Sequence, residues 1–158
     1  MKKQITIHYE FHPLTELSAA DRELVEQAIA ATNNSYSPYS HFRVGAAARL
    51  ADGTIFIGAN QENAAFPSGL CAERTALFAA QAQRPEQPVV ALAIAAGNAE
   101  SLTDKPISPC GSCRQVMIEL EDRYKNNMRI MLYGTDGVYT FETAHDLLPI
   151  SFIGDDMK

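Results

Sequence analysis

The run VVALAIAA at residues 89–96 constrains the fold of this chain most strongly, because all eight of its residues are apolar. Such a strand is typical of a sheet that helices cover on both faces, since a face open to water would carry polar residues. Helical segments rich in apolar residues are expected on either side of it, after Cys71 and after Cys110. The run therefore predicts a buried central strand between two layers of helices.

Local patterns predict the elements around this strand. A capping-box pattern that begins at Ser18 predicts a helix over residues 19–32. The pair Asp52-Gly53 predicts a tight turn between two strands within residues 43–59. Further elements are expected as strands over 4–11, 128–134 and 137–142 and as a helical turn over 143–149. The order β-α-β-β-α-β-α-β-β predicts an α/β fold in three layers with a mixed sheet.

Composition argues against several classes of protein. The formal net charge of −6 disfavours binding to nucleic acid, which usually needs a basic surface. No apolar run approaches the ~20 residues of a membrane helix, and the N-terminus lacks the apolar core of a signal peptide. A length of 158 residues with 46% hydrophobic residues suits one domain. We therefore expect a single cytoplasmic domain with neither nucleic-acid nor membrane partners.

The placement of the cysteines carries the strongest chemical signal. The chain has three, Cys71, Cys110 and Cys113, and each lies at the predicted start of a helix. An odd number in a reducing compartment argues against a disulfide framework. Free backbone N–H groups and the positive end of the helix dipole stabilise thiolates, the form that binds metal. We therefore expect the three thiolates to converge on one ion, most plausibly Zn²⁺.

The number of ligands predicts an open zinc site. Structural zinc sites take four protein ligands, whereas catalytic sites use three and leave a position for water. There is no fourth cysteine, and no histidine stands at a ligand spacing, His41 being the first to check. Glu73, two residues after Cys71, is the candidate to accept a proton from that water. Arg74 and Arg114 are candidates to donate hydrogen bonds to the sulfurs and to offset their charge.

Three other interpretations of the cysteines are weighed against this one. A C-x-x-C pair also occurs in thioredoxin-like redox proteins, but that chemistry leaves Cys71 and Glu73 unused. Buried cysteines without a chemical role are common as well. A zinc-stabilised binding module without catalysis would use the same residues, and it predicts a closed coordination shell.

Several motifs together resemble the short, homotetrameric, zinc-dependent cytidine deaminase family. The two that carry the resemblance are C-A-E at 71–73 and P-C-G-S-C-R-Q at 109–115. The segments YSPYSHFRVGAA at 36–47 and GANQENAAF at 58–66 extend it, so that it spans roughly residues 19–152. In nucleotide-level and tRNA-acting relatives the first ligand is more often histidine, so a cysteine there favours free nucleosides.

The resemblance implies a fold and a reaction. The fold is a three-layer α/β/α sandwich around a five-stranded mixed sheet, in one domain over 1–158, to which residues 1–12 add an N-terminal strand. The reaction is zinc-dependent hydrolytic deamination of cytidine and deoxycytidine to uridine and deoxyuridine in pyrimidine salvage. It implies one zinc per chain and Glu73 as acid and base. A deaminase for another aminopyrimidine nucleoside, such as blasticidin S, is the alternative.

The resemblance also implies roles in binding the nucleoside. Phe42 packs on the pyrimidine ring, and Asn60 and Glu62 hold the ribose hydroxyls. The backbone of Ala72 reads the edge of the base together with Glu73. Amide and carboxylate groups are suitable partners for hydroxyls, and an aromatic ring offers a stacking face.

The family's assembly implies a homotetramer of dihedral symmetry. In that arrangement Phe66 and Phe152 reach the substrate of an adjacent subunit. The family usually has tyrosine where this chain has Phe66, so a hydroxyl contact is lost there. Loops rich in aromatic residues are also typical of a ligand site or an interface.

Overall fold

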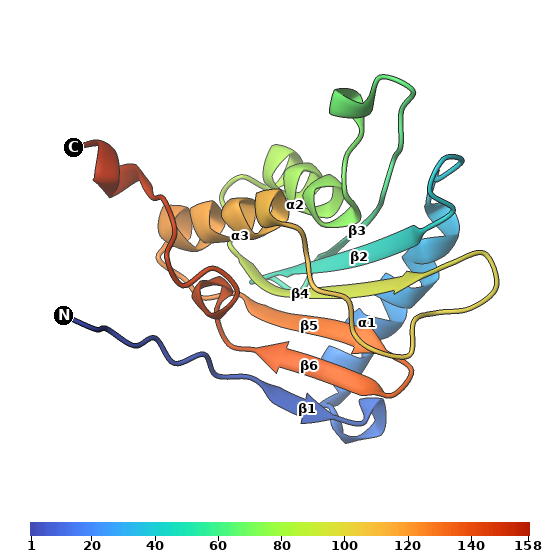
Figure 1. Cartoon of the computed structure of the whole chain (residues 1–158), viewed down its shortest axis with the longest axis horizontal. Helices are drawn as coiled ribbons and strands as arrows, with labels where there is room; N and C mark the ends of the chain where they lie inside the picture. The colour runs from blue at the N-terminus through green and yellow to red at the C-terminus, as the bar shows by residue number, and fades with distance from the viewer.

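The architecture is a mixed sheet of six strands in the order β1-β6-β5-β4-β2-β3. The computed structural model describes residues 1–158 and is drawn in Figure 1. Strands β4 and β5 are parallel, and every other pair of neighbours is antiparallel. The strands are β1 (Glu10–His12), β2 (Arg43–Leu50), β3 (Ile55–Ala59), β4 (Val89–Gly97), β5 (Arg129–Gly134) and β6 (Gly137–Phe141).

Three α-helices cover the sheet, α1 on one face and α2 with α3 on the other (Figure 1). None of them combines the length and the apolar character that a membrane span needs. The three layers and the mixed sheet are as predicted. The helices are α1 (Ala19–Ala31), α2 (Ala72–Gln83) and α3 (Gly111–Tyr124), with short 3-10 turns η1 (Leu14–Glu16), η2 (Thr32–Asn34), η3 (Phe66–Ser68), η4 (Ala144–Asp146) and η5 (Gly154–Met157).

Strand β4 is buried along almost its whole length, as its apolar run predicts. Leu92 and Ile94 belong to the larger buried cluster, which lies beneath α2 and α3. Ala91, Ala93 and Ala95 point to the opposite face and belong to the cluster beneath α1. Both faces of this strand therefore contact helices.

The local signals form the turns and caps that the sequence predicts. The hydroxyl of Ser18 accepts a hydrogen bond from the backbone N–H of Asp21 at 3.1 Å, which caps α1. Between β2 and β3, Gly53 has a φ of +89°, a conformation that glycine adopts at little cost. Asp52 stabilises the same turn by accepting a hydrogen bond from the backbone N–H of Thr54 at 2.9 Å.

The N-terminal strand is shorter than the alternation over residues 4–11 predicts. Only Glu10–His12 pairs with β6, and Glu10 lies opposite Thr140. The prediction is wrong for residues 4–9. In this register residues 4–8 would lie opposite 142–146, beyond the end of β6 at Phe141, so no strand is there to pair with them. They continue away from the sheet instead (Figure 1).

Strand β4 also brings the heads of two helices together. Helix α2 leads into β4, and α3 leads from β4 to its parallel neighbour β5. Both helices therefore run opposite to β4 on the same face, and both begin near its C-terminal end. In open α/β sheets ligands bind beyond the C-terminal ends of strands.

Glycine at position 58 allows α2 to approach the sheet closely. A Cβ atom there would lie 2.4 Å from the carbonyl oxygen of Ala72 and 2.5 Å from the backbone nitrogen of Ala76. Both atoms belong to the helix backbone, so a side chain could be accommodated only if α2 moved. The first turn of α2 carries Cys71 and Glu73, so this contact also determines where those two side chains lie.

We predict that Gly58→Ala lowers the free energy of unfolding by about 1–3 kcal/mol, because it overpacks the contact between β3 and α2. It should also weaken zinc retention, since α2 is displaced. Urea denaturation and elemental analysis measure the two effects. Gly154→Ala is the matched control, because its added Cβ has nothing within 4 Å. Equal stability of the two variants would contradict the prediction.

Candidate metal centre and active site

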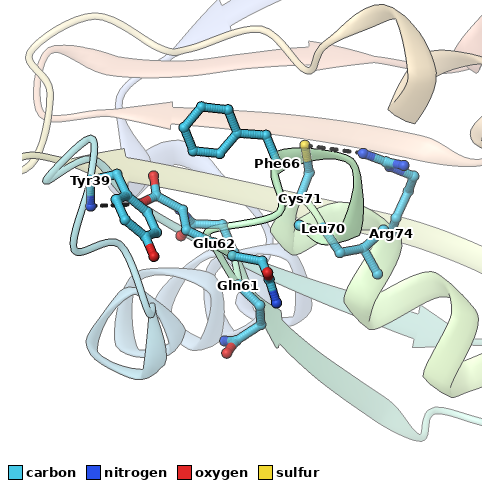
Figure 2. Close-up of a pocket in the computed structure, with 10 residues that line it drawn as sticks. Tyr39, Gln61, Glu62, Phe66, Leu70, Cys71 and Arg74 are labelled. Carbon is cyan, nitrogen blue, oxygen red and sulfur yellow. Dashed lines mark hydrogen bonds between the residues drawn. The ribbon is translucent and has the colours of Figure 1, made fainter.

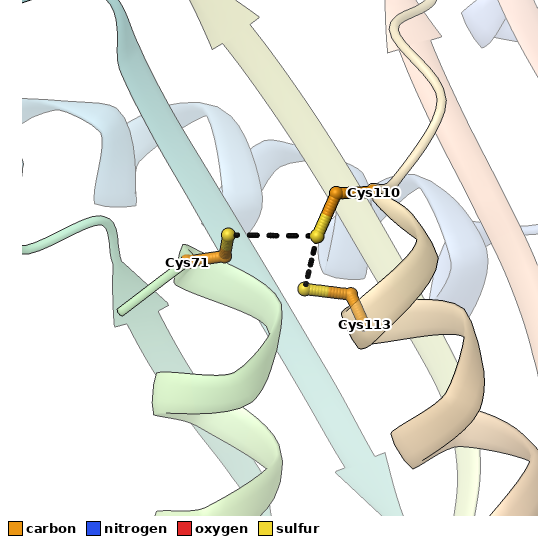
Figure 3. Close-up of side chains that lie close together, drawn as sticks. All are labelled: Cys71, Cys110 and Cys113. Atoms are coloured by element: carbon orange, nitrogen blue, oxygen red, sulfur yellow. Dashed lines mark hydrogen bonds between the residues drawn. The ribbon is translucent and has the colours of Figure 1, made fainter. Parts of the chain in front are cut away.

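The starts of α2 and α3 bring the three cysteines together (Figure 3). Cys71 is the N-cap of α2, Cys110 is the N-cap of α3, and Cys113 lies in the first turn of α3. The Sγ atom of Cys110 lies 3.8 Å from that of Cys71 and 3.5 Å from that of Cys113. All three sulfur atoms lie within 4.8 Å of one another.

These separations fit zinc held by three thiolates. A tetrahedral ion with Zn–S bonds of about 2.3 Å keeps its sulfur ligands about 3.8 Å apart. The cluster contains no histidine, and His41 lies exposed in the loop before β2. The donor set therefore matches a zinc site with three protein ligands, as the family's cofactor requires.

The thiols share their protons unequally. Hydrogen bonding from Cys113, and then from the Arg74 guanidinium, lowers the pKa of Cys71 to about 5. The neighbouring Cys71 and burial raise the pKa of Cys113, whose side chain is fully buried. Of these two thiols, Cys71 is therefore the one whose surroundings favour the thiolate. An ionised thiol is the form that ligates zinc.

The two candidate arginines differ in their contacts. Arg74 donates from Nη2 to Sγ of Cys71 at 3.5 Å, as expected. Arg114 does not contact sulfur but donates to the carbonyl oxygens of Pro109 at 2.8 Å and Leu147 at 2.7 Å. Its side chain leaves the first turn of α3 away from the cluster, towards the C-terminal segment. Arg74 is therefore placed to offset thiolate charge, whereas Arg114 joins the cysteine-bearing turn to the end of the chain.

Glu73 lies next to the cysteines in a protected position. Its side chain is almost fully buried, and burial raises the pKa of its carboxyl group above the ordinary value. It lines a cavity of about 310 Å³ together with Cys71 and Cys110, and Phe42 lines another part of the same cavity. The site thus combines three sulfur ligands, a buried carboxyl group and space for a small molecule.

Glu62 lines the same cavity in a polar environment. Its carboxylate accepts hydrogen bonds from the backbone N–H groups of Tyr39 at 2.9 Å and Ser40 at 3.2 Å, and from the Ser40 hydroxyl. The hydrogen bond from Ser40 is the main reason why the pKa of Glu62 is lowered. Glu62 is therefore an ionised acceptor, a state that suits binding of hydroxyl groups.

The side chain of Asn60 connects neighbouring segments that line the cavity through three hydrogen bonds. Its Oδ1 atom accepts from the Ser35 hydroxyl at 2.6 Å and from the backbone N–H of Val44 at 2.8 Å. Its Nδ2 atom donates to the carbonyl oxygen of Phe42 at 2.9 Å. These contacts tie the loop after β3 to the start of β2, so Asn60 also positions Phe42.

A second cavity, of about 270 Å³, adjoins the first and shares Asn60, Glu62 and Cys71 with it (Figure 2). Phe66 and Tyr39 line it, with their ring centroids 6.0 Å apart. Phe66 is 76% exposed and Phe152 is 58% exposed. Neither phenylalanine lines the cavity in front of Glu73 within its own chain.

Comparisons with known proteins give the family. Residues 18–127 match the family model described as the cytidine and deoxycytidylate deaminase zinc-binding region. The chain belongs to this family. It is 42% identical to a cytidine deaminase of Halalkalibacterium halodurans over 139 residues, which are 87% of this chain and 98% of that protein.

Solved structures of deaminases from the same family agree with this fold. The crystal structure of cytidine deaminase from Burkholderia pseudomallei is 44% identical and superposes with a TM-score of 0.71 over 82% of this chain and 97% of that one. The structure of cytidine deaminase from Mycobacterium tuberculosis is 32% identical, with a TM-score of 0.66 over 85% of this chain and 98% of that one. Both similarities cover nearly the whole length of the deaminases compared.

No local sequence pattern identifies the residues that orient Glu62 and Asn60. The role of Ser40 towards Glu62 and that of Ser35 towards Asn60 depend on loops meeting in space. His41 in the same loop has a φ of +55°, and its backbone N–H donates a hydrogen bond to the carbonyl oxygen of Ser37 at 3.0 Å. The only signal was the polar, proline-broken composition of the loop, which does not specify these contacts.

We predict that Arg74→Gln releases zinc to a chelator about tenfold faster or more, because removal of a charged group that contacts a ligand weakens metal binding on this scale. Arg114→Gln is the matched variant. It should lower the free energy of unfolding by about 1–3 kcal/mol through its lost hydrogen bonds, with zinc release near that of the native protein. Equal rates of zinc release from the two variants would show that the contact between Arg74 and the sulfur of Cys71 does not stabilise bound zinc.

Proposed function

We propose that this protein is a zinc-dependent hydrolase that deaminates cytidine and deoxycytidine to uridine and deoxyuridine. One observation carries the proposal: Cys71, Cys110 and the buried carboxyl group of Glu73 line a single cavity of about 310 Å³, and the sulfur of the buried Cys113 lies within 4.8 Å of the other two sulfurs. Three sulfur ligands leave one position of a tetrahedral ion for water, which a closed structural site would not offer. This favours a catalytic centre over a binding module.

Glu73 is the group that moves protons. When bound by Cys71, Cys110 and Cys113, zinc supplies a Lewis acid that makes water nucleophilic at neutral pH. The carboxylate of Glu73 accepts a proton from the water whose oxygen bonds to C4 of the cytosine ring, and it delivers that proton to the ring nitrogen N3. It then transfers the proton of the new hydroxyl group to the amino group, so that the C4–N bond breaks, ammonia leaves and the C4 carbonyl forms. Its raised pKa lies closer to neutrality than that of an exposed glutamate, which suits a group that both takes and gives a proton.

The rest of the cavity suits a pyrimidine nucleoside. Phe42 supplies an aromatic face for the base. Ala72 is fully buried in the first turn of α2, between the cavity-lining residues Cys71 and Glu73, and we propose that its backbone binds the edge of the base. Glu62, ionised and open to solvent, is placed to accept hydrogen bonds from ribose hydroxyls, with Asn60 beside it. Thiolate ligation needs reduced cysteines, which supports a cytoplasmic location.

We predict that Glu73→Gln lowers turnover of cytidine by at least ~10²-fold, because glutamine keeps the shape but cannot accept a proton. Elemental analysis should give about one zinc per chain in both proteins. Formation of uridine, followed by absorbance, measures the rate. Glu62→Gln is the matched control and should raise KM more than it lowers kcat. Near-native turnover in Glu73→Gln would assign proton transfer to another residue, with Glu62 the next to test.

We also propose that the whole chain, 1–158, forms one domain and that four copies assemble with dihedral symmetry. The second cavity supports this assembly, because the exposed ring of Phe66 stands beside Cys71 without covering the substrate cavity of its own chain. Phe152 is also exposed, and Gln115 holds its segment by donating from Nε2 to the carbonyl oxygen of Phe152 at 2.7 Å. In the tetramer both rings would complete a neighbour's site.

We predict that light scattering gives about four chain masses at working concentration, because closed symmetric assemblies bury such exposed rings. Phe152→Ala should raise KM, since the ring reaches a neighbour's substrate. Ile150→Ala, another exposed side chain of the same segment, should leave KM near the native value. A fully active species of one chain mass would contradict both the tetramer and the shared site.

A further inference from the structure

Residues 2–9 are exposed, precede the edge strand β1 without belonging to the sheet, and have no part in the proposed function. Strand β1 is the outermost strand of the sheet, at the edge opposite β3. Residues 4–9 before it make no backbone–backbone hydrogen bond. Their one hydrogen bond is donated by the backbone N–H of His8 to the carboxylate of Asp146 at 3.4 Å. An uncovered edge of this kind is a template for another strand.

The side chains of this segment alternate regularly. Ile5, Ile7 and Tyr9 alternate with polar residues in the sequence, and each is 47–58% exposed. Tyr9 contacts Tyr139 and Phe141, with ring centroids 5.4 Å and 5.5 Å away. Tyr9 therefore packs at the sheet surface that carries α2 and α3, whereas about half of the surface of Ile5 and of Ile7 is not covered by their own chain.

The usual protections of an edge strand are missing from its centre. Natural edges carry charges, proline or bulges that discourage pairing. Between Gln4 and Tyr9 there is no lysine, arginine, aspartate or glutamate, whereas Lys2 and Lys3 lie at one end and Glu10 lies at the other. The edge is therefore open in its middle and charged with opposite signs at its ends.

These features point to a second copy of the same segment. We propose that residues 2–10 of two chains pair as antiparallel strands across a two-fold axis at Thr6. In this register Ile5 lies opposite the partner's Ile7, and Lys2 lies opposite the partner's Glu10, each pair occurring twice. Opposite charges and apolar pairs facing each other across strands stabilise the pairing.

Other registers are less complementary. A shift by one residue places apolar side chains opposite polar ones. A shift that places Ile7 on the axis sets Lys3 opposite Phe11 and Glu10 opposite Gln4. A shift that places Ile5 on the axis sets Lys2 opposite His8. Of these registers, the one centred on Thr6 is the one that pairs opposite charges.

The proposed pairing lies away from the zinc centre. Strand β1 is at one edge of the sheet, with β6 and β5 between it and β4, whereas α2 and α3 begin near the C-terminal end of β4 (Figure 1). A single pair of strands is marginal in water, so it adds to other contacts between chains. Covalent trapping detects such a contact whether it forms within one assembly or between two.

Single cysteines test the register in the zinc-loaded, full-length protein exposed to oxidised glutathione. Opposed residues on the axis have Cβ atoms about 5 Å apart, whereas residues one position away face their own copies diagonally at about 7–8 Å. Thr6→Cys should therefore give roughly tenfold more product of two chain masses than Ile5→Cys or Ile7→Cys, because disulfides need close Cβ atoms. Thr6→Ser is the matched control and should give none.

The charges are tested in the Thr6→Cys background. Lys2→Glu and Glu10→Lys should each reduce trapping about threefold or more, and the double variant should restore it, because the opposite charges face each other again. Zinc content and deamination should stay unchanged throughout. Absence of product from Thr6→Cys, faster trapping at Ile5 or Ile7, or no recovery in the double variant would each overturn the proposal and assign the edge to a different occupant.

Discussion

Three sulfur ligands confined within 4.8 Å of one another repel when ionised, and the fold around them is organised to offset that repulsion. Each cysteine lies at the start of a helix, where free N–H groups and the helix dipole favour negative charge. Arg74 adds a positive charge in direct contact with Cys71. The same arrangement holds the sulfurs at separations that zinc needs, so the site is prepared for metal by the backbone as much as by side chains.

The sheet makes this convergence possible. The parallel pair of β4 and β5 requires a crossover, and α3 is that crossover, which sets its start beside the start of α2. Small residues then bring α2 close to the strands beneath it. Gly58 meets the backbone of Ala72 and Ala76, which no larger residue could do without moving the helix. The position of α2 at this contact determines where Cys71 lies relative to the other two cysteines.

The sequence predicts the elements well, because their signals are local. The apolar run of β4, the cap at Ser18 and the turn at Gly53 each depend on a few neighbouring residues, and all three are observed. Convergence of the cysteines could also be anticipated from helix starts alone. The hydrogen-bond partners of Arg114 and the length of β1 could not be predicted in this way. They depend on where Leu147 and the end of β6 lie in space. Contacts between distant loops have no local pattern to announce them.

The two carboxyl groups of the site illustrate how environment separates chemically identical residues. Glu73 is buried beside thiolates, and the loss of water raises its pKa, so it can take up a proton readily. Glu62 receives hydrogen bonds from Ser40 and from two backbone N–H groups, which lower its pKa and keep it ionised. Pairs of titratable groups whose surroundings separate their pKa values identify acid–base roles. The surroundings of the two groups therefore support the roles proposed for them, proton transfer for Glu73 and hydroxyl binding for Glu62, on grounds that do not depend on their positions in the sequence.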